Sequence, residues 1–327
     1  MTSEITYREA IVAALQEEMR RDPTTLIMGE DIGPSGGPFK TCQGLYEEFG
    51  AARVRDTPIA ETGFVGAALG LALTGYRPIA EIMFADFLGV CFDQIVNGIA
   101  KHRFMSGGKV KVPLVIRAIG GAGLRFGAQH SQTAESWMLS VPGLKILVPS
   151  TPAEAYGMLK AAIRDDNPVL ILEHKALLSS KGPVPVGSDA PPMPDGPKVV
   201  RAGGDVTIVA SLAMLGRALA AADLLAAEGI AAEVIDMRVL RPMNTAPIAE
   251  SVRRTNLLVT VEEQARVGGW SAEVITQIVE DAFDDLDAPP ARLSLPDHPL
   301  PYSPPLEDAL IPTPEAIAAT ARALVRE

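Results

Sequence analysis

The sequence has 327 residues, of which 47% are hydrophobic and 21% charged, and its formal net charge is −11. At about 100–200 residues per domain, this length predicts two domains that each bury a core. The negative charge and the lack of a dense Lys/Arg stripe argue against nucleic acid or an anionic membrane surface as the main partner, because binding either one requires positive charge.

Neither a secretory signal nor a membrane-spanning helix is expected. The N-terminus carries charges where a signal peptide has an apolar core. The longest uncharged stretch, between Glu61 and Arg77, is shorter than the about twenty residues of a transmembrane helix. The two cysteines, Cys42 and Cys91, form no C-x-x-C pair, so we expect reduced thiols in a cytoplasmic protein.

Short apolar runs alternate with longer amphipathic segments along the N-terminal half, a pattern typical of βαβ units. Thr6 and Glu9 have the spacing of a capping box that opens a first helix, and Thr151 and Glu154 repeat that spacing with a proline between them. The other elements expected in this half are helices at 44–49 and 87–105 and strands at 26–28, 77–84, 112–118, 145–149 and 169–172.

Residues 179–204 contain six prolines and five glycines without apolar periodicity, which indicates a linker. The sequence therefore predicts an α/β fold class with two doubly wound α/β domains, at 1–178 and 205–327. The elements expected in the second domain are strands at 206–210, 232–236 and 257–261, helices at 215–228, 248–254 and 270–283, and a last helix after a proline-rich crossing at 289–314.

Glu61 stands immediately before the longest uncharged stretch of the chain. A carboxyl group in such surroundings is desolvated and tends to keep its proton, as a catalytic acid does. An equally good explanation from the pattern alone is a glutamate that complements the dipole at a helix N-terminus. The glycines at 63, 66, 70 and 75 are expected along one helix after Glu61, where close approach of another helix or subunit would explain them.

His130 follows a glycine-rich loop, between Gln129 and Ser131. A loop histidine next to amide and hydroxyl groups can be held in one tautomer and act as acid, base or hydrogen-bond donor, although an isolated loop histidine is more often ordinary. The sequence contains no P-loop, G-x-S-x-G elbow, H-E-x-x-H motif or paired Cys/His zinc spacing.

Several motifs together resemble the β subunit of the thiamine-diphosphate-dependent E1 component of 2-oxo acid dehydrogenase complexes, a member of the transketolase-like superfamily. The resemblance covers essentially the whole chain. The motifs that carry it are DTPIAETGFVG at 56–66, FADF at 84–87, FDQI at 92–95, AQHSQ at 128–132, PGLK at 142–145, IRDDNP at 163–168 and RVLRPM at 238–243.

The resemblance implies a pyrimidine-binding N-terminal domain and a transketolase-type C-terminal domain. Glu61 matches the glutamate that hydrogen-bonds N1′ of the cofactor's aminopyrimidine, which favours the tautomer that removes the thiazolium C2 proton. Phe87 matches an aromatic ring placed against the pyrimidine. His130 matches a histidine that helps to position intermediates and the incoming lipoyl group.

The resemblance also implies ions and partners. A structural K⁺ would be held by a segment matched here by Leu114, Ala162, Ile163, Asp165 and Asn167, whose oxygen donors suit a hard cation. Single-chain relatives bind Mg²⁺ and the diphosphate through a Gly-Asp-Gly motif, which this sequence lacks. An α subunit is therefore expected to supply that half of the site in an α2β2 heterotetramer.

The expected activity is decarboxylation of a 2-oxo acid such as pyruvate, or cleavage of acetoin, followed by transfer of the acyl group to the lipoyl arm of an E2 acyltransferase. Residues 88–91 and 172–175 favour acetoin, while pyruvate and branched-chain substrates stay open. The alternative is a non-catalytic scaffold or assembly subunit with the same fold. A scaffold has no need to keep Glu61, Phe87 and His130 together.

Overall fold

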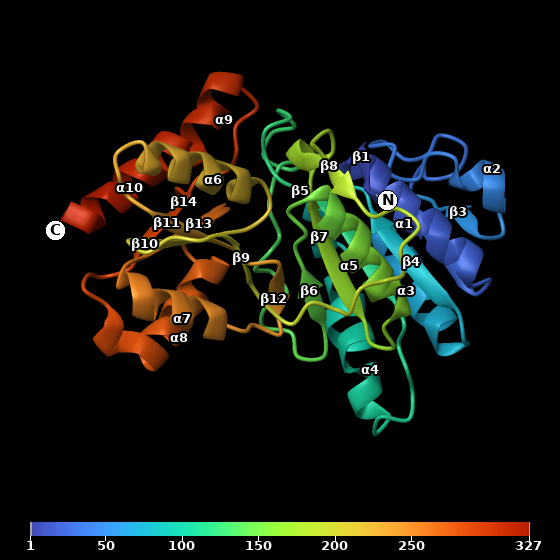
Figure 1. Ribbon diagram of the computed structural model, residues 1–327. Helices are drawn as coiled ribbons and strands as arrows, with labels where there is room; N and C mark the ends of the chain where they lie inside the picture. Colours follow the sequence, from blue (N-terminus) through green and yellow to red (C-terminus); the bar gives the residue numbers. More distant parts are fainter. Residues whose placement is uncertain (1, 327) are drawn as a thin grey trace. The chain divides into compact units, whose positions relative to one another are not determined.

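The computed structural model describes residues 2–326 and contains two compact units (Figure 1). Unit 1 comprises the residues up to Gly120 together with Ser140–Pro194, and unit 2 comprises Gly121–Leu139 together with the residues from Asp195 onward. Each unit has an α/β fold with its own sheet, as the sequence predicts. Within residues 2–326, every helix is too short or too polar to cross a bilayer.

The sheet of unit 1 consists of parallel strands in the order β6-β7-β5-β4-β2-β3. Strands β2, β4, β5 and β7 are almost continuously buried, as expected for a parallel sheet covered on both faces. Their bounds are β2 Thr25–Gly29, β3 Val54–Asp56, β4 Arg77–Ile82, β5 Val115–Gly120, β6 Lys145–Leu147 and β7 Val169–His174.

The first helix of unit 1 begins where the sequence predicts. The Thr6 hydroxyl accepts a hydrogen bond from the Glu9 amide at 3.2 Å, and the Glu9 carboxylate accepts one from the Thr6 amide at 2.7 Å. At the start of α5, the Thr151 hydroxyl accepts from the Glu154 amide at 3.2 Å. Helices α1 and α5 pack together. The α-helices of unit 1 are α1 Tyr7–Arg21, α2 Leu45–Phe49, α3 Glu61–Leu73, α4 Ala100–Met105 and α5 Pro152–Arg164.

The predicted helix at 87–105 is wrong as a single element. The structure has a 3₁₀-helix at Ala85–Gly89, a π-helix at Gln94–Ile99 and only then α4. The π-helix contains Gly98, where an added Cβ would lie 3.2 Å from the Leu69 side chain of α3. Close packing on α3 therefore competes with regular α-helical winding, and this tertiary contact is invisible to apolar periodicity.

Unit 2 has a five-stranded sheet in the order β14-β13-β10-β11-β9, parallel except for β9. Helices α6 and α10 pack together on one face, and α7 and α8 pack together on the other (Figure 1). The strands of this sheet are β9 Lys198–Arg201, β10 Val206–Ala210, β11 Ala232–Asp236, β13 Leu258–Ala265 and β14 Ala291–Leu295. The short strand β12, Val239–Arg241, is not part of it. The helices are α6 Ala213–Ala226, α7 Ala246–Thr255, α8 Trp270–Ala282, α9 Pro304–Leu310 and α10 Pro314–Arg326.

Two short strands lie inside the segment that the sequence predicts as a linker. Strand β8, Lys181–Val184, pairs antiparallel with β1, Ser3–Thr6, at the edge of unit 1. Strand β9 pairs antiparallel with β11 in unit 2. Both pairings join segments far apart in the chain, so local composition gives no sign of them.

A buried ionic network joins three neighbouring strands of unit 1. Arg117 on β5 is fully buried and donates two hydrogen bonds to Glu173 on β7, at 2.7 and 2.8 Å, and one to Glu81 on β4, at 2.5 Å. The same Glu81 carboxylate accepts from the Thr41 hydroxyl at 3.1 Å and from the Cys42 thiol at 3.3 Å. The segment between β2 and α2 is thereby tied to the centre of the sheet.

Replacing Arg117 by methionine should destabilise the protein strongly, because it leaves two buried carboxylates without their cation. Breaking a buried pair in this way costs about 3–5 kcal/mol. The measurement is the free energy of unfolding in urea. The control is Arg322→Met, which removes a pair with Glu228 at the surface of unit 2 and should have far less effect, because solvent screens an exposed ion pair. Equal losses in the two variants would contradict the central role of Arg117.

Candidate active site

The candidate site lies at the carboxyl edge of the parallel strands in unit 1, where ligands of open α/β sheets bind. The strand ends are level there, because Gly29 on β2 pairs with Asp56 on β3 and with Glu81 on β4. Just beyond these ends, the Thr57 amide donates to the Gly29 carbonyl at 3.0 Å. The residues that follow β2, β3 and β4 are therefore brought together.

Glu61 is the first residue of α3 and is only 5% exposed. Its helix is joined to the segment after β4 by a 2.7 Å hydrogen bond from the Thr62 hydroxyl to the Val90 carbonyl. The carboxyl group is therefore buried and also stands at a helix N-terminus.

Glu30 is a second buried carboxyl group beside Glu61, and the sequence analysis did not identify it. It follows β2 directly and is 5% exposed. Burial, together with the charges of Glu61 and Asp31, raises the pKa of Glu30 to about 7. The signal in the sequence that could have identified Glu30 is the acidic pair Glu30-Asp31, which comes directly after the apolar run of β2.

Two buried oxygens at this edge are not satisfied by the chain. Among residues 2–326, eight buried side-chain atoms lack a hydrogen-bond partner, and Glu30 Oε1 and Thr57 Oγ1 are two of them. Because buried polar groups are almost always paired, such atoms mark a place where a ligand's polar groups would fit. This observation sets the edge apart from the fully paired Arg117 network.

Phe87 lies in the 3₁₀-helix after β4 and is half-buried. Its ring meets Phe84 edge to face at a centroid distance of 5.9 Å, and Phe84 meets Phe39 in the same way at 5.5 Å. The Lys175 ammonium lies 5.3 Å from the Phe84 ring centre. An aromatic cluster therefore borders the carboxyl edge and fixes the Phe87 ring.

Both cysteines are free and buried, in agreement with the expected reduced thiols. Burial, together with the charge of Glu61, raises the pKa of Cys91 to about 12. Burial also raises the pKa of Cys42, together with the charge of Glu81. Both side chains stay protonated at neutral pH and are poor nucleophiles.

His130 lies in unit 2, whereas Glu61 and Phe87 lie in unit 1. It is half-buried, and its amide donates to the Gly127 carbonyl at 3.3 Å. The structure thus groups Glu61, Phe87 and the newly found Glu30, and it places His130 on a separate segment.

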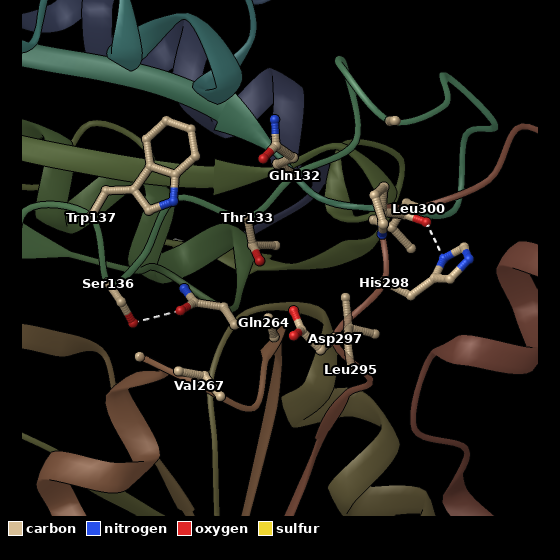
Figure 2. Close-up of a pocket in the computed structure, with 14 residues that line it drawn as sticks. Gln132, Thr133, Ser136, Trp137, Gln264, Val267, Leu295, Asp297, His298 and Leu300 are labelled. Atoms are coloured by element: carbon tan, nitrogen blue, oxygen red, sulfur yellow. Dashed lines mark hydrogen bonds between the residues drawn. The ribbon is translucent and has the colours of Figure 1, made fainter.

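A cavity of about 320 Å³ lies in unit 2 beside the His130 segment (Figure 2). One wall is this segment, and the others come from the ends of β13 and β14. The Ser136 hydroxyl donates to the Gln264 side-chain oxygen across the cavity at 2.5 Å. The polar side chains that line it are Gln132, Thr133, Ser136, Trp137, Gln264, Asp297 and His298.

The five residues matched to a cation site gather around the turn that ends α5. The carbonyl of Ala162 accepts from the Asp165 amide at 3.2 Å, and that of Leu114 accepts from the amide of residue 169 at 3.0 Å. The Asp165 carboxylate accepts from Asn167 at 2.8 Å. Burial opposes ionisation of Asp165, but its hydrogen bonds with Lys145 and Asn167 outweigh this and lower its pKa.

A guanidinium already lies at this turn. Arg77 donates to the carbonyl of Ile163 at 3.1 Å and to that of Asp165 at 3.0 Å. Each carbonyl oxygen has a second lone pair, so these contacts leave acceptor capacity for a metal ion. Within residues 2–326, no three His, Cys, Asp or Glu side chains gather as a metal-binding group.

Packing within residues 2–326 does not require glycine at positions 63, 66 and 70 of α3. In the described residues, a Cβ at Gly63 or Gly66 would meet only ordinary contacts at 3.7 Å, and one at Gly70 would meet nothing within 4 Å. Gly75 lies beyond the end of the helix with a φ of +97°, so its inclusion in the predicted helix is wrong. A glycine is required there by the left-handed backbone.

Two protein families match nearly the whole chain. Residues 3–181 match the transketolase pyrimidine binding domain, and residues 197–317 match the transketolase C-terminal domain. A solved chain described as a split gene transketolase, inactive β4 tetramer, is 27% identical, with a TM-score of 0.79 over 99% of both chains. The transketolase-like fold expected from the sequence is confirmed.

The curated relatives carry two kinds of name. The chain is 45% identical to the mitochondrial pyruvate dehydrogenase E1 component subunit beta-2 of Oryza sativa subsp. japonica, over 98% of this chain and 86% of that protein. It is 44% identical to the beta subunit of acetoin:2,6-dichlorophenolindophenol oxidoreductase of Cupriavidus necator, over 98% of both chains. The corresponding Bacillus subtilis subunit is 42% identical over 100% of this chain and 99% of that protein. These matches confirm the resemblance found from the motifs.

The raised pKa of Glu30 predicts that the protein becomes less stable to unfolding as the pH rises. The folded protein keeps the Glu30 proton up to a pH of about 7, whereas the unfolded chain releases it near pH 4.5. Glu30 therefore does not reduce the free energy of unfolding below about pH 4.5. The free energy of unfolding falls as the pH rises from there to about 7. At about 1.4 kcal/mol per pKa unit, the difference between 4.5 and about 7 corresponds to a loss of at most about 3.5 kcal/mol.

Glu30→Gln should abolish this loss, so its stability relative to the unchanged protein should rise between pH 4.5 and pH 8. The measurement is urea unfolding at several pH values. The matched control is Glu9→Gln, whose stability relative to the unchanged protein should stay nearly constant over this range, because hydrogen bonds with Thr6 lower the pKa of Glu9 and its carboxyl group therefore titrates below pH 4.5. Parallel pH profiles for Glu30→Gln and the unchanged protein would refute the assignment.

Proposed function

We propose a function for this chain from the premise that it belongs to the family of E1 β subunits of pyruvate and acetoin dehydrogenases. With an α subunit, the chain forms a thiamine-diphosphate-dependent oxidoreductase. The complex decarboxylates a 2-oxo acid or cleaves acetoin and passes the acyl group to the lipoyl arm of an E2 acyltransferase. The observation that carries the proposal is the pair of buried carboxyl groups, Glu30 and Glu61, beside unsatisfied oxygens at the carboxyl edge of unit 1.

The residues at this edge fit the pyrimidine half of thiamine diphosphate. Bound there, the cofactor would supply a carbanion that attacks the substrate carbonyl. Glu61 would hydrogen-bond N1′ of the aminopyrimidine from its sheltered place at the start of α3. Phe87 would support the ring with an aromatic face held by Phe84. The orphaned oxygens of Glu30 and Thr57 are suitable acceptors for polar groups of the ligand.

An α subunit is required because the chain has only part of the cofactor's binding groups. The sequence contains no Gly-Asp-Gly motif, so we assign the Mg²⁺ and diphosphate site to the partner. The glycines at 63, 66 and 70 of α3 support an α2β2 heterotetramer, since they leave a small-residue surface that this chain does not use. His130, as in the resemblance, would serve the transfer to the lipoyl group.

Acetoin is the substrate that the sequence favours, through residues 88–91 and 172–175. Val90 and Cys91 follow the 3₁₀-helix of Phe87, and Lys175 contacts the Phe84 ring, so both segments adjoin the candidate site. Pyruvate and branched 2-oxo acids are the alternatives. A non-catalytic scaffold is the competing function, and it would have no use for Glu61 and its neighbours.

Glu61→Gln should reduce activity by at least about a hundredfold with every substrate, because a general acid–base group contributes about 10²–10⁴-fold. The chain is co-expressed with its α subunit, supplied with thiamine diphosphate and Mg²⁺, and assayed by acceptor reduction with acetoin, pyruvate and branched 2-oxo acids. Glu9→Gln, at the surface of α1, is the matched control and should keep full activity.

Three outcomes would contradict the proposal. Full activity of Glu61→Gln would exclude the assigned role of the carboxyl group. Inactivity of the unchanged complex with all substrates would favour the scaffold. Tight binding of thiamine diphosphate by the isolated chain would contradict a site completed by the α subunit.

We also propose a K⁺ site at the turn after α5, formed by Leu114, Ala162, Ile163, Asp165 and Asn167. It is supported by carbonyl oxygens with acceptor capacity around one ionised carboxylate, Asp165, a donor set that suits a hard cation. Arg77 would then share the carbonyls with the metal ion and contribute to the same turn.

KCl should stabilise the protein more than NaCl at equal ionic strength. A ligand at a hundred times its Kd adds about 2.7 kcal/mol, which corresponds to a few degrees in Tm for domains of this size. The measurement is thermal unfolding in the two salts. Asp165→Asn should remove the difference, while Asp308→Asn, in unit 2, should keep it. Identical melting curves of the unchanged protein in both salts would exclude the site.

A further inference from the structure

The segment that carries His130 is a loop whose two ends are hydrogen-bonded to each other. The Gly121 amide donates to the Gln132 carbonyl at 3.0 Å, and this pair of residues forms the neck of the loop. His130 lies between these two residues. A loop closed in this way behaves as a compact body whose position depends on what holds its neck and its tip.

Glu263 on β13 holds both sides of the neck. Its carboxylate accepts from the Ala122 amide at 2.6 Å, and its main-chain carbonyl accepts from the Thr133 hydroxyl. Glu263 is 4% exposed and Ala122 only 1%. One residue of the central strand region therefore fixes the entry and the exit of the loop, in surroundings that exclude water.

Glu307 on α9 holds the other end of the loop. This fully buried carboxylate accepts from the Gly123 amide at 3.3 Å and forms an ion pair with Arg125. Arg125 also reaches Asp308 at 2.7 Å. Arg125 has a φ of +65°, a conformation that a non-glycine residue adopts only when its surroundings impose it.

The chain beyond the neck is fixed as well, next to the cavity of Figure 2. Buried Glu135 accepts from the Trp270 indole at 3.0 Å and from the Gln264 amide at 3.2 Å, and Gln264 in turn accepts from Ser136. Burial, together with the charges of Glu262 and Glu263, raises the pKa of Glu135 to about 8. Glu135 is thus mainly protonated at neutral pH, so this contact adds little negative charge to the region.

We propose that Glu263 and Glu307 are positioning residues for His130, and that they act by fixing the neck and tip of its loop. The inference rests on the proposed function, because the work of His130 is defined there. Unit 2 would then contribute to the reaction by positioning His130, in addition to any role in subunit assembly. Loosening the loop should impair catalysis, since a displacement of about 1 Å at a reacting group can reduce a rate a hundredfold.

Hydrogen exchange tests directly, without reference to activity, whether the contacts of Glu307 with Gly123 and Arg125 hold the loop in place. The complex with the α subunit is compared with the variants Glu307→Gln and Arg125→Gln, the second of which changes a partly exposed side chain and preserves the core. Amides at 122–130 should exchange at least about tenfold faster in both. The matched control is Arg254→Gln, which removes an arginine from buried Glu233 elsewhere in unit 2 and should leave these amides unchanged. Unchanged exchange in Arg125→Gln would overturn the inference.

A double-mutant cycle tests whether the ion pair of Arg125 with Glu307 acts through His130. Arg125→Gln should reduce the kcat of lipoyl acylation about tenfold with little change in the substrate KM, and Arg125→Lys should restore most of it. Combined with His130→Ala, Arg125→Gln should cause no further loss. Additive losses would overturn the inference. If the unchanged complex has no activity, the proposed function fails, while the exchange result still decides whether Glu307 fixes the loop.

Discussion

Unit 1 depends on the pairing of Arg117 with Glu81 and Glu173 inside its sheet. A buried charge is tolerated only when its partners are close and well oriented. The three side chains come from adjacent strands, so they constrain how β4, β5 and β7 lie side by side. Through Glu81 the constraint extends to Thr41 and to the segment that follows Glu30. The carboxyl edge is therefore held rigid before any ligand arrives.

This rigidity explains how a second set of buried carboxyl groups can remain uncompensated. At the same edge the charge of Glu61 raises the pKa of Glu30, whereas Arg117 lies between Glu81 and Glu173 and pairs with both. Such an arrangement costs stability and is kept where the uncharged form of a carboxyl group is useful. The contrast between the paired carboxylates of Glu81 and Glu173 and the unsatisfied Glu30 oxygen is the strongest physical support for the proposed site.

Much of the fold could be predicted from the sequence, because its signals are local. The capping box at Thr6 and the buried runs of β10 and β11 are encoded within a few residues, and the structure confirms them. The winding of the segment around Gly98 is different, since it depends on contact with α3. Strands β8 and β9 likewise escape prediction, because their partners lie far away in the chain.

The candidate site shows the same division. Glu61 could be singled out from its uncharged surroundings, but the role of Glu30 became visible only when its burial and its neighbour were known. The resemblance assigned His130 a role but gave no reason for its loop to be ordered. That order comes from Glu263 and Glu307, which are more than a hundred residues later in the chain.

Carboxyl groups therefore serve three purposes in this chain, and their surroundings decide which. With a guanidinium between them, as at Arg117, they hold a sheet together. With backbone amides as partners, as at Glu263, they hold a loop in place. With neither, as at Glu30, they retain a proton near neutral pH. A single acidic residue type thus links three strands of unit 1, holds the His130 loop and supports the proposed proton chemistry, because each purpose requires a different set of hydrogen-bond partners.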